Sequence, residues 1–133
     1  MAEIIKKSDI DKVLALPASA GKKMLFKSSL FPFGILEDHA VSNDAETHMA
    51  EGDLWYCLEG EVNFIYGGEL VEPWFVKDKN GNENKNEQKA KEIRGGAEIV
   101  LKPGDWLWVA PGEPHRHNCE KTARLAIIKV PKT

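Results

Sequence analysis

The sequence lacks the features that several large classes of protein require. It has no apolar run approaching the roughly 18–20 residues of a membrane-spanning helix, so we expect no membrane segment. Its start, MAEIIKKSDIDKVLAL, carries acidic residues and has no long apolar stretch followed by small residues, so we expect no secretory signal. The formal net charge is only −3, which gives no general attraction to nucleic acid or to an anionic membrane.

Several chemical motifs are also missing. The sequence has no nucleophile elbow, phosphate-binding loop, CxxC pair or basic-aromatic patch, so acyl-enzyme hydrolysis, nucleotide binding and nucleic-acid recognition find no support in it. Only two cysteines occur, Cys57 and Cys119. Without an export signal we expect both to be reduced thiols of a cytoplasmic protein, and small buried side chains rather than metal ligands or nucleophiles.

What remains is a chain of ordinary composition. Its 133 residues suffice for one domain and leave no room for a second full core. Near the start, KKSDIDKVLALP predicts a short helix over about residues 8–15, because apolar residues recur on one face and proline follows. The residues that support the helix are Ser8 as its cap, the stripe Ile10, Val13 and Leu14, and the terminating Pro17.

From about residue 24 to residue 130 the pattern is typical of β-structure. Short apolar runs such as FGILED, DLWYCLEG and ARLAIIKVP are bounded by proline, glycine and charged residues. Turn signals recur about every 8–12 residues, which predicts an all-β sandwich or barrel.

One segment breaks this pattern. Residues 77–92, KDKNGNENKNEQKAKE, are almost wholly polar. We expect a solvated excursion between strands that is partly disordered and contributes nothing to the core, because it buries too little to offset chain entropy. The alternative is a lid over the mouth of a pocket, since long loops are often functional.

Polar side chains interrupt the expected strands at positions that share a face. Glu46 and His48 lie on one face if their segment is extended, Asp53 opens the next strand, and His115 and His117 share a face by the same alternation. A barrel that curls these strands together would bring imidazole nitrogens and carboxylate oxygens to one point. Zn, Fe, Mn and Ni sites are built from such ligands.

The spacing of the second histidine pair resembles a motif of the cupin superfamily, a group of small jelly-roll β-barrels. That motif reads Gly, five residues, Pro-x-Gly, two residues, His. The segment GDWLWVAPGEPH supplies Gly104, Gly112 and His115 at matching places, with the proline moved one step to Pro111. Cys119 stands where the family has a final Asn.

The other cupin motif is matched by spacing more than by identity. It reads His-x-His, three or four residues, Glu, six residues, Gly. Counting back from Gly60, Asp53 takes the Glu position, His48 the second His and Glu46 the first His, so the chain carries E-x-H-x4-D-x6-G. The resemblance covers about residues 24–130 and implies an all-β cupin jelly-roll barrel with a short N-terminal helix, in a single domain over residues 1–133.

The resemblance also implies a divalent metal ion, Fe, Mn or Zn, inside the barrel. His48, Asp53 and His115 alone would form a two-histidine, one-carboxylate set that suits Fe(II), whereas adding Glu46 favours a harder ion such as Mn(II), with Zn(II) also compatible. His117 either replaces the missing imidazole or supports the site from behind, although family position favours His115 as the ligand. The alternative is a barrel that has kept its shape and lost its metal.

On the same resemblance we expect a metal-dependent enzyme acting on a small oxygen-rich organic molecule. The metal would act as a Lewis acid, and Glu46, His117 or Asp53 would move a proton in isomerase, cyclase or lyase chemistry, or support Fe(II) dioxygenation. The alternative is a barrel that binds or senses a small molecule without turning it over. Small cupins commonly pair, so a homodimer is expected, with neither nucleic acid nor membrane as a partner.

The remaining histidine and the tryptophans have structural interpretations. His39 is expected on the surface, with a proton shuttle at the pocket rim as the alternative. Trp55, Trp106 and Trp108 are expected to pack in the core or on a dimer face, and the alternative is a stacking wall for a ring-shaped ligand. Trp74 precedes the polar segment and is a candidate to close the pocket.

Overall fold

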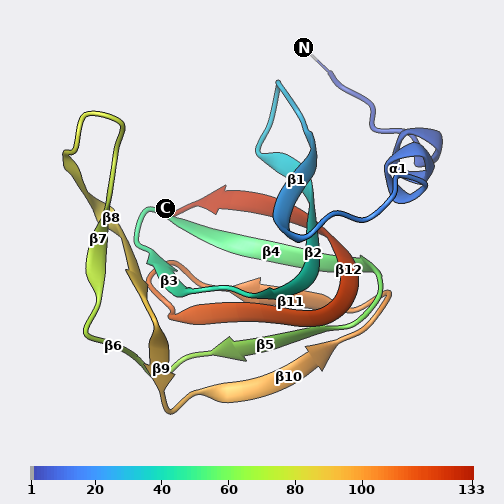
Figure 1. Ribbon diagram of the computed structural model, residues 1–133. Helices are drawn as coiled ribbons and strands as arrows, with labels where there is room; N and C mark the ends of the chain where they lie inside the picture. The colour runs from blue at the N-terminus through green and yellow to red at the C-terminus, as the bar shows by residue number, and fades with distance from the viewer. Residues whose placement is uncertain (1) are drawn as a thin grey trace.

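Antiparallel strands form almost the whole fold of residues 2–133, the part of the chain that this computed structural model describes (Figure 1). The elements are α1 (Lys7–Leu14), β1 (Gly21–Lys27), β2 (Phe33–Ser42), β3 (Ala45–His48), β4 (Glu51–Glu59), β5 (Val62–Tyr66), β6 (Glu69–Val71), β7 (Trp74–Lys77), β8 (Glu83–Ala90), β9 (Glu92–Arg94), β10 (Ala97–Leu101), β11 (Trp106–Val109) and β12 (His115–Pro131). The predicted all-β jelly roll with a short N-terminal helix is confirmed.

Strand β12 joins the two layers of the barrel. Its first residues pair with β5 and β3, and its later residues pair with β4. Strand β2 pairs with residues of β12 on both sides of the bend. The register with β2 shifts between Cys119 and Thr122, where the strand bends from one layer to the other (Figure 1). Gly60, in the turn between β4 and β5, has a φ of +74° and lies against the backbone of Thr122. A side chain at position 60 would collide with this bend, so the close approach requires glycine.

The core fills the space between the layers with side chains from alternate positions of the strands. Trp55, Phe64 and Leu125 are fully buried there. Cys57 and Cys119 are free thiols in the same core, as expected. Burial raises the pKa of the Cys57 thiol to about 11 and also raises that of Cys119, so both thiols are poor nucleophiles.

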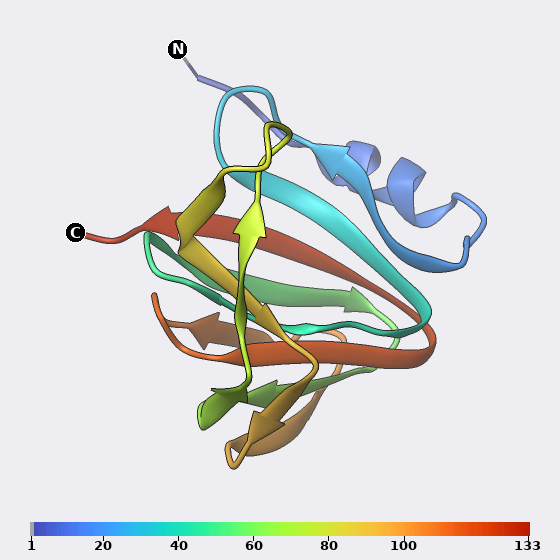
Figure 2. The same cartoon turned by 60° about the vertical axis from the view of Figure 1, so that its left-hand side comes forward.

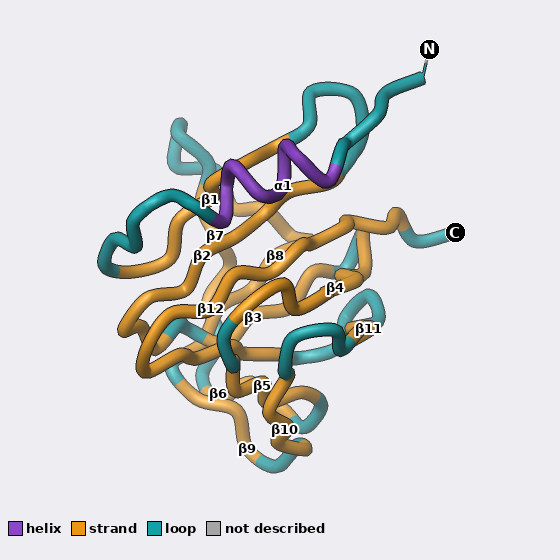
Figure 3. Tube along the Cα trace, turned by 90° about the vertical axis from the view of Figure 1, so that its right-hand side faces the viewer, coloured by secondary structure: helices purple, strands orange, loops and turns teal. Residues whose placement is uncertain are grey.

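The N-terminal helix lies outside the barrel, alongside β1 and β2 (Figure 3). It spans Lys7–Leu14, close to the predicted range, but Ser8 is not its cap. The helix begins after Lys6, whose backbone N–H donates to the carboxylate of Asp9 at 3.1 Å, because a carboxylate in the first turn can satisfy a free amide. Arg124, paired with Glu37 at 2.8 Å, donates to carbonyls at the far end of the helix. None of the described residues forms a helix long and apolar enough to cross a membrane.

Residues 83–90 correct the expectation for the polar segment. They form β8, which pairs with β7 on one side and with β3 on the other, so the segment is neither irregular nor a free lid. The hairpin of β7 and β8 extends away from the barrel in Figure 1 and crosses in front of it in Figure 2. Its turn is organised by Asp78, whose carboxylate accepts the backbone N–H groups of Asn80 and Asn82. Backbone pairing on both edges holds β8 in place, so its side chains can be polar.

Candidate metal centre

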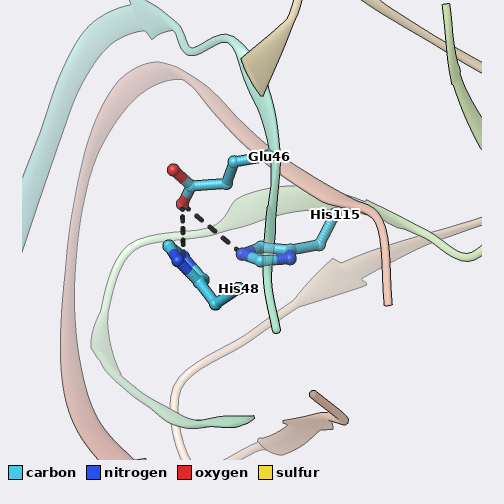
Figure 4. A group of neighbouring side chains, drawn as sticks. All are labelled: Glu46, His48 and His115. Carbon is cyan, nitrogen blue, oxygen red and sulfur yellow. Dashed lines mark ion pairs between the residues drawn. The ribbon is translucent and has the colours of Figure 1, made fainter. Parts of the chain in front are cut away.

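Two strands, β3 and β12, bring Glu46, His48 and His115 together inside the barrel. The register of β3 and β12 places Glu46 opposite His115, and His48 follows Glu46 on the same face of β3. Both imidazoles point their Nε2 atoms at the same Glu46 oxygen, Oε1, at 3.3 Å from His48 and 3.4 Å from His115 (Figure 4). One ligating atom from each residue lies within 4.8 Å of the others, which is the arrangement that a bound cation needs.

Asp53 lies beside this group, on the neighbouring strand β4. Its Oδ2 atom is 3.3 Å from His115 Nε2 and 3.8 Å from His48 Nε2. Its other oxygen, Oδ1, accepts a hydrogen bond from Lys129 Nζ at 2.7 Å. Asp53 therefore borders the centre with one oxygen engaged by a lysine and the other directed at the histidines.

The buried polar atoms at the centre lack hydrogen bonds among residues 2–133. His115 Nε2, both ring nitrogens of His48 and Asp53 Oδ2 have no hydrogen-bond partner in this part of the chain. An unpaired buried polar atom costs about 1–3 kcal/mol, and native proteins contain few of them. Two imidazole nitrogens and up to two carboxylates are a suitable donor set for a divalent ion, so the residues fit the metal that the cupin resemblance implies.

The turn before β12 orients His115. His115 Nδ1 donates to the carbonyl of Glu113 at 3.0 Å, which leaves Nε2 to face the centre. The same turn is attached to β3, because the N–H of Gly112 donates to the carbonyl of His48 at 2.7 Å. Gly112 adopts a φ of +80°, a conformation that favours glycine. The Pro-Gly-Glu-Pro corner therefore fixes the positions of both histidines.

Glu87 is a neighbour of the centre that the sequence did not reveal. It lies on β8 directly opposite His48, and its Oε1 atom is 3.4 Å from His48 Nδ1, close enough for an ion pair but not aligned as a hydrogen bond. Its role could not be predicted, because it lies in an almost wholly polar segment that showed no strand pattern. The only sequence signal was the Asn80-Gly81 turn, which is typical of a hairpin.

The charges of the centre are strongly coupled. Burial acts to raise the pKa of Glu46, but His115 and His48 outweigh it and hold the pKa well below its usual range. Burial acts to lower the pKa of His115, but Asp53 and Glu46 outweigh it and raise the pKa to about 9. Burial also opposes ionisation of Asp53, yet His115 and Lys129 lower its pKa overall. Without a metal, His115 is therefore an imidazolium between carboxylates at neutral pH.

His117 belongs to a separate buried group. Its Nδ1 atom lies 2.5 Å from Asp38 Oδ2, and its ring packs between Trp55 and Phe64, with centroids 5.1 and 5.5 Å away. Asn43 Nδ2 donates to the carbonyl of His117 at 2.7 Å. His117 is therefore not among the three residues whose ligating atoms converge. The sequence did not point to Asp38, because its partner is far along the chain.

The other residues singled out from the sequence lie apart from the centre. His39 Nδ1 is 2.6 Å from Thr122 Oγ1 and His39 does not join the ligating group. Trp55 is buried in the core, whereas Trp106 and Trp108 are 60% and 47% exposed. Trp74 is 42% exposed on β7, with Lys91 Nζ 5.9 Å from its ring. A groove of about 1080 Å³ over the bend of β12 is lined by neither His48 nor His115.

Comparison with solved structures shows the fold. The Drosophila melanogaster CENP-C cupin domain aligns with a TM-score of 0.51 at 13% identity, over 77% of this chain and 62% of that one. Drosophila melanogaster CENP-C bound to CAL1 aligns with a TM-score of 0.52 at 12% identity, over 77% of this chain and 68% of that one. A predicted oxalate decarboxylase from Thermotoga maritima aligns at 0.49 and 16% identity, over 75% of this chain and 65% of that one. No family model matches the sequence, and neither does any curated protein.

Proposed function

The chain has a cupin fold, and we propose that it binds one divalent metal ion through Glu46, His48 and His115. The observation that carries this proposal is the convergence of two imidazole Nε2 atoms on one buried carboxylate oxygen (Figure 4). Neither nitrogen has a hydrogen-bond partner among the described residues. A cation among these three atoms would satisfy them all. Asp53, whose Oδ2 atom faces both histidines, is proposed as a fourth residue that would hold the metal or accept a hydrogen bond beside it.

We propose further that the metal centre serves an enzyme acting on a small oxygen-rich organic molecule. When bound, the metal would supply Lewis-acid chemistry, or the redox chemistry of Fe(II) if iron is the ion. His117, held at Nδ1 by Asp38, presents Nε2 as the atom that would move a proton. Glu46 carries a second oxygen that points away from both imidazoles, and it is the other proposed proton carrier (Figure 4). Isomerase, cyclase and lyase reactions need such proton transfers.

A binding or sensing module is the second candidate. It is favoured by the structural neighbour CENP-C, whose cupin-containing structure is bound to a protein partner. In that case the metal centre would hold a ligand without turnover. Turnover of small keto acids or sugars by the metal-loaded protein, lost in His115→Ala, would decide for the enzyme.

Metal analysis tests the proposal directly. Protein purified without chelator is expected to contain one Mn, Fe or Zn ion per chain, and His48→Ala and His115→Ala are each expected to lose most of it. His39→Ala is the matched control, since this histidine contacts Thr122 and lies outside the ligating group. Equal metal content in all four proteins would contradict the assigned site.

We also propose a homodimer formed through β11. In the described chain this strand pairs only with β4, its residues Trp106–Val109 carry no charge, and two tryptophans are exposed on it. Uncharged edge strands are normally covered, and two copies of one strand can pair across a two-fold axis. The free thiols Cys57 and Cys119 fit the reducing cytoplasm, the location we propose.

A further inference from the structure

A small polar cavity opens beside the metal centre. Its volume is about 250 Å³, and its walls include Lys22, Asn43, Asp44, Glu46, Lys89 and His117. Glu46 belongs to both the cavity and the ligating group, so the two sites share a wall. At roughly 30 Å³ for each water molecule in the liquid, the cavity has room for a small organic molecule and not for a nucleotide.

The strand registers explain how the cavity forms. Lys89 of β8 lies opposite Glu46 of β3, which in turn lies opposite His115 of β12, so these three residues form a row across one layer. Lys22 of β1 lies opposite Asp38 of β2 in the other layer. The two lysines therefore come from different layers, Lys22 from the edge strand β1 and Lys89 from the inner strand β8, and both line the cavity.

The two lysines are the unpaired charges of this cavity. Neither Lys22 nor Lys89 makes an ion pair or a side-chain hydrogen bond with any residue of the described range 2–133. The acidic wall residues have other partners, since Asp44 pairs with Lys91 at 2.9 Å and Glu46 faces the two histidines of the centre. Lys22 and Lys89 are thus the charged residues of the wall that have no oppositely charged partner in the described chain, which favours an anionic ligand between them.

The part of the cavity wall formed by His117 and Asn43 is polar and is held by hydrogen bonds. His117 has its Nδ1 atom engaged by Asp38, so Nε2 is the ring atom left for a ligand. Asn43 Nδ2 is held by the His117 carbonyl at 2.7 Å and by Asp38 Oδ1 at 3.3 Å. These hydrogen bonds fix the imidazole before any ligand arrives, and such preorganisation favours binding.

We propose that this cavity binds a small organic acid, with its carboxylate between Lys22 and Lys89 and its other end directed at Glu46 and His117. This inference rests on the proposed function, because it makes the acid the substrate or ligand of the same metal centre. The proposed substrate or ligand, described above as a small oxygen-rich molecule, is then specifically a carboxylic acid. The neutral amide of the same acid lacks the charge that the lysines recognise.

A calorimetric titration with glutarate and with its neutral diamide, glutaramide, tests the proposal on Mn-loaded and metal-free protein. The double variant Lys22→Gln/Lys89→Gln is compared with Lys23→Gln/Lys85→Gln, which removes the same charge from the same two strands. In the control pair Lys23 is exposed and Lys85 pairs with Glu83. The single variants Lys22→Gln and Lys89→Gln are included because each disturbs the fold less.

Wild type and the control are expected to bind glutarate more tightly than glutaramide. Each of the Lys22→Gln and Lys89→Gln changes is expected to weaken glutarate binding about ten-fold, the effect of one charged hydrogen bond. Equal glutarate affinities in wild type, the control and the Lys22→Gln/Lys89→Gln variant would overturn the inference while leaving the metal site intact. Failure of Mn²⁺ to bind would instead contradict the proposed function. The titration of metal-free protein would then measure the contribution of the two lysines to glutarate binding.

Discussion

His115 is the residue on which the chemistry of the centre depends most. It is almost completely buried, faces two carboxylates at 3.3 and 3.4 Å, and has its Nδ1 atom fixed by the Glu113 carbonyl. The raised pKa favours the protonated imidazole in the metal-free protein, so a proton competes with a metal for Nε2. Metal binding must therefore release this proton, so the affinity for a divalent ion is expected to rise with pH.

The same proton makes the stability of metal-free protein depend on pH. The pKa of His115 is raised from 6.5 in the unfolded chain to about 9 in the fold, so its stabilising contribution is complete below pH 6.5 and is lost as pH rises through 9. The free energy of unfolding is expected to fall by up to about 3 kcal/mol between these values. Urea unfolding at about pH 6.5 and 9.5 measures this loss. His115→Gln should remove it and His39→Ala should not; an unchanged loss in His115→Gln would contradict the assignment.

The two carboxylates of the centre are expected to differ in importance. Glu46 faces both imidazoles with one oxygen, whereas Asp53 has one oxygen engaged by Lys129. We expect Glu46→Gln to weaken metal binding more than Asp53→Asn, with the latter in the roughly 10- to 100-fold range typical of residues that support a ligand. Competition titrations against a metal-sensitive dye measure both affinities. The reverse order would make Asp53 the principal carboxylate.

At the level of residues, the sequence revealed those that a motif spacing marks and missed those defined only by long-range pairing. Glu46, His48 and His115 could be grouped because strand alternation and the cupin spacing both indicated them. Asp38 and Glu87 carried no such signal, since their partners His117 and His48 lie on other strands. The pairing of His117 with Asp38 was missed for the same reason: alternation gives the face of a strand but not the neighbour across the barrel.

Among the elements, the β7–β8 hairpin contributes most that the sequence did not show. Residues 83–90 lack the apolar alternation of a half-buried strand, yet β3 and β7 pair with them on both edges. The backbone hydrogen bonds, which no side-chain pattern records, decide the conformation here. The pairing with β3 places Glu87 against His48 and so connects the hairpin to the metal centre.

Glu87 provides the prediction that belongs to this element. Its carboxylate, 3.4 Å from His48 Nδ1, is expected to hold the ring orientation that directs Nε2 at Glu46. Glu87→Ala should weaken metal binding about ten-fold, as is typical for loss of a group behind a ligating histidine. Glu83→Ala, on the same strand but paired with Lys85, is the control and should have no effect. Equal metal affinities in the two variants would show that β8 only covers the centre.

For the whole molecule, the exposed edge strand β11 predicts self-association. Trp106 is 60% exposed and packs on Tyr56 with ring centroids 4.4 Å apart, so a lysine there would place charge in the proposed interface without emptying the core. Sedimentation of wild type should give twice the chain mass of 14.9 kDa, and Trp106→Lys should give the monomer. Trp74→Lys, a second exposed tryptophan on β7, should stay dimeric. A monomeric wild type would contradict the proposed homodimer.

The overall architecture was the most predictable part, because turn signals and alternating strands specify an all-β barrel without any knowledge of pairing. The short helix was also predictable, although its first residue depended on the carboxylate of Asp9 and not on Ser8. The proposed function depends instead on a bound metal, which turn signals and strand alternation do not specify.

The most direct test of the central claim is anomalous X-ray scattering from crystals of protein purified without chelator. We expect a single anomalous peak bonded to Glu46, His48 and His115, and the absorption edge would identify the metal. A peak elsewhere in the molecule, or clean density with the three side chains hydrogen-bonded only to water, would contradict it.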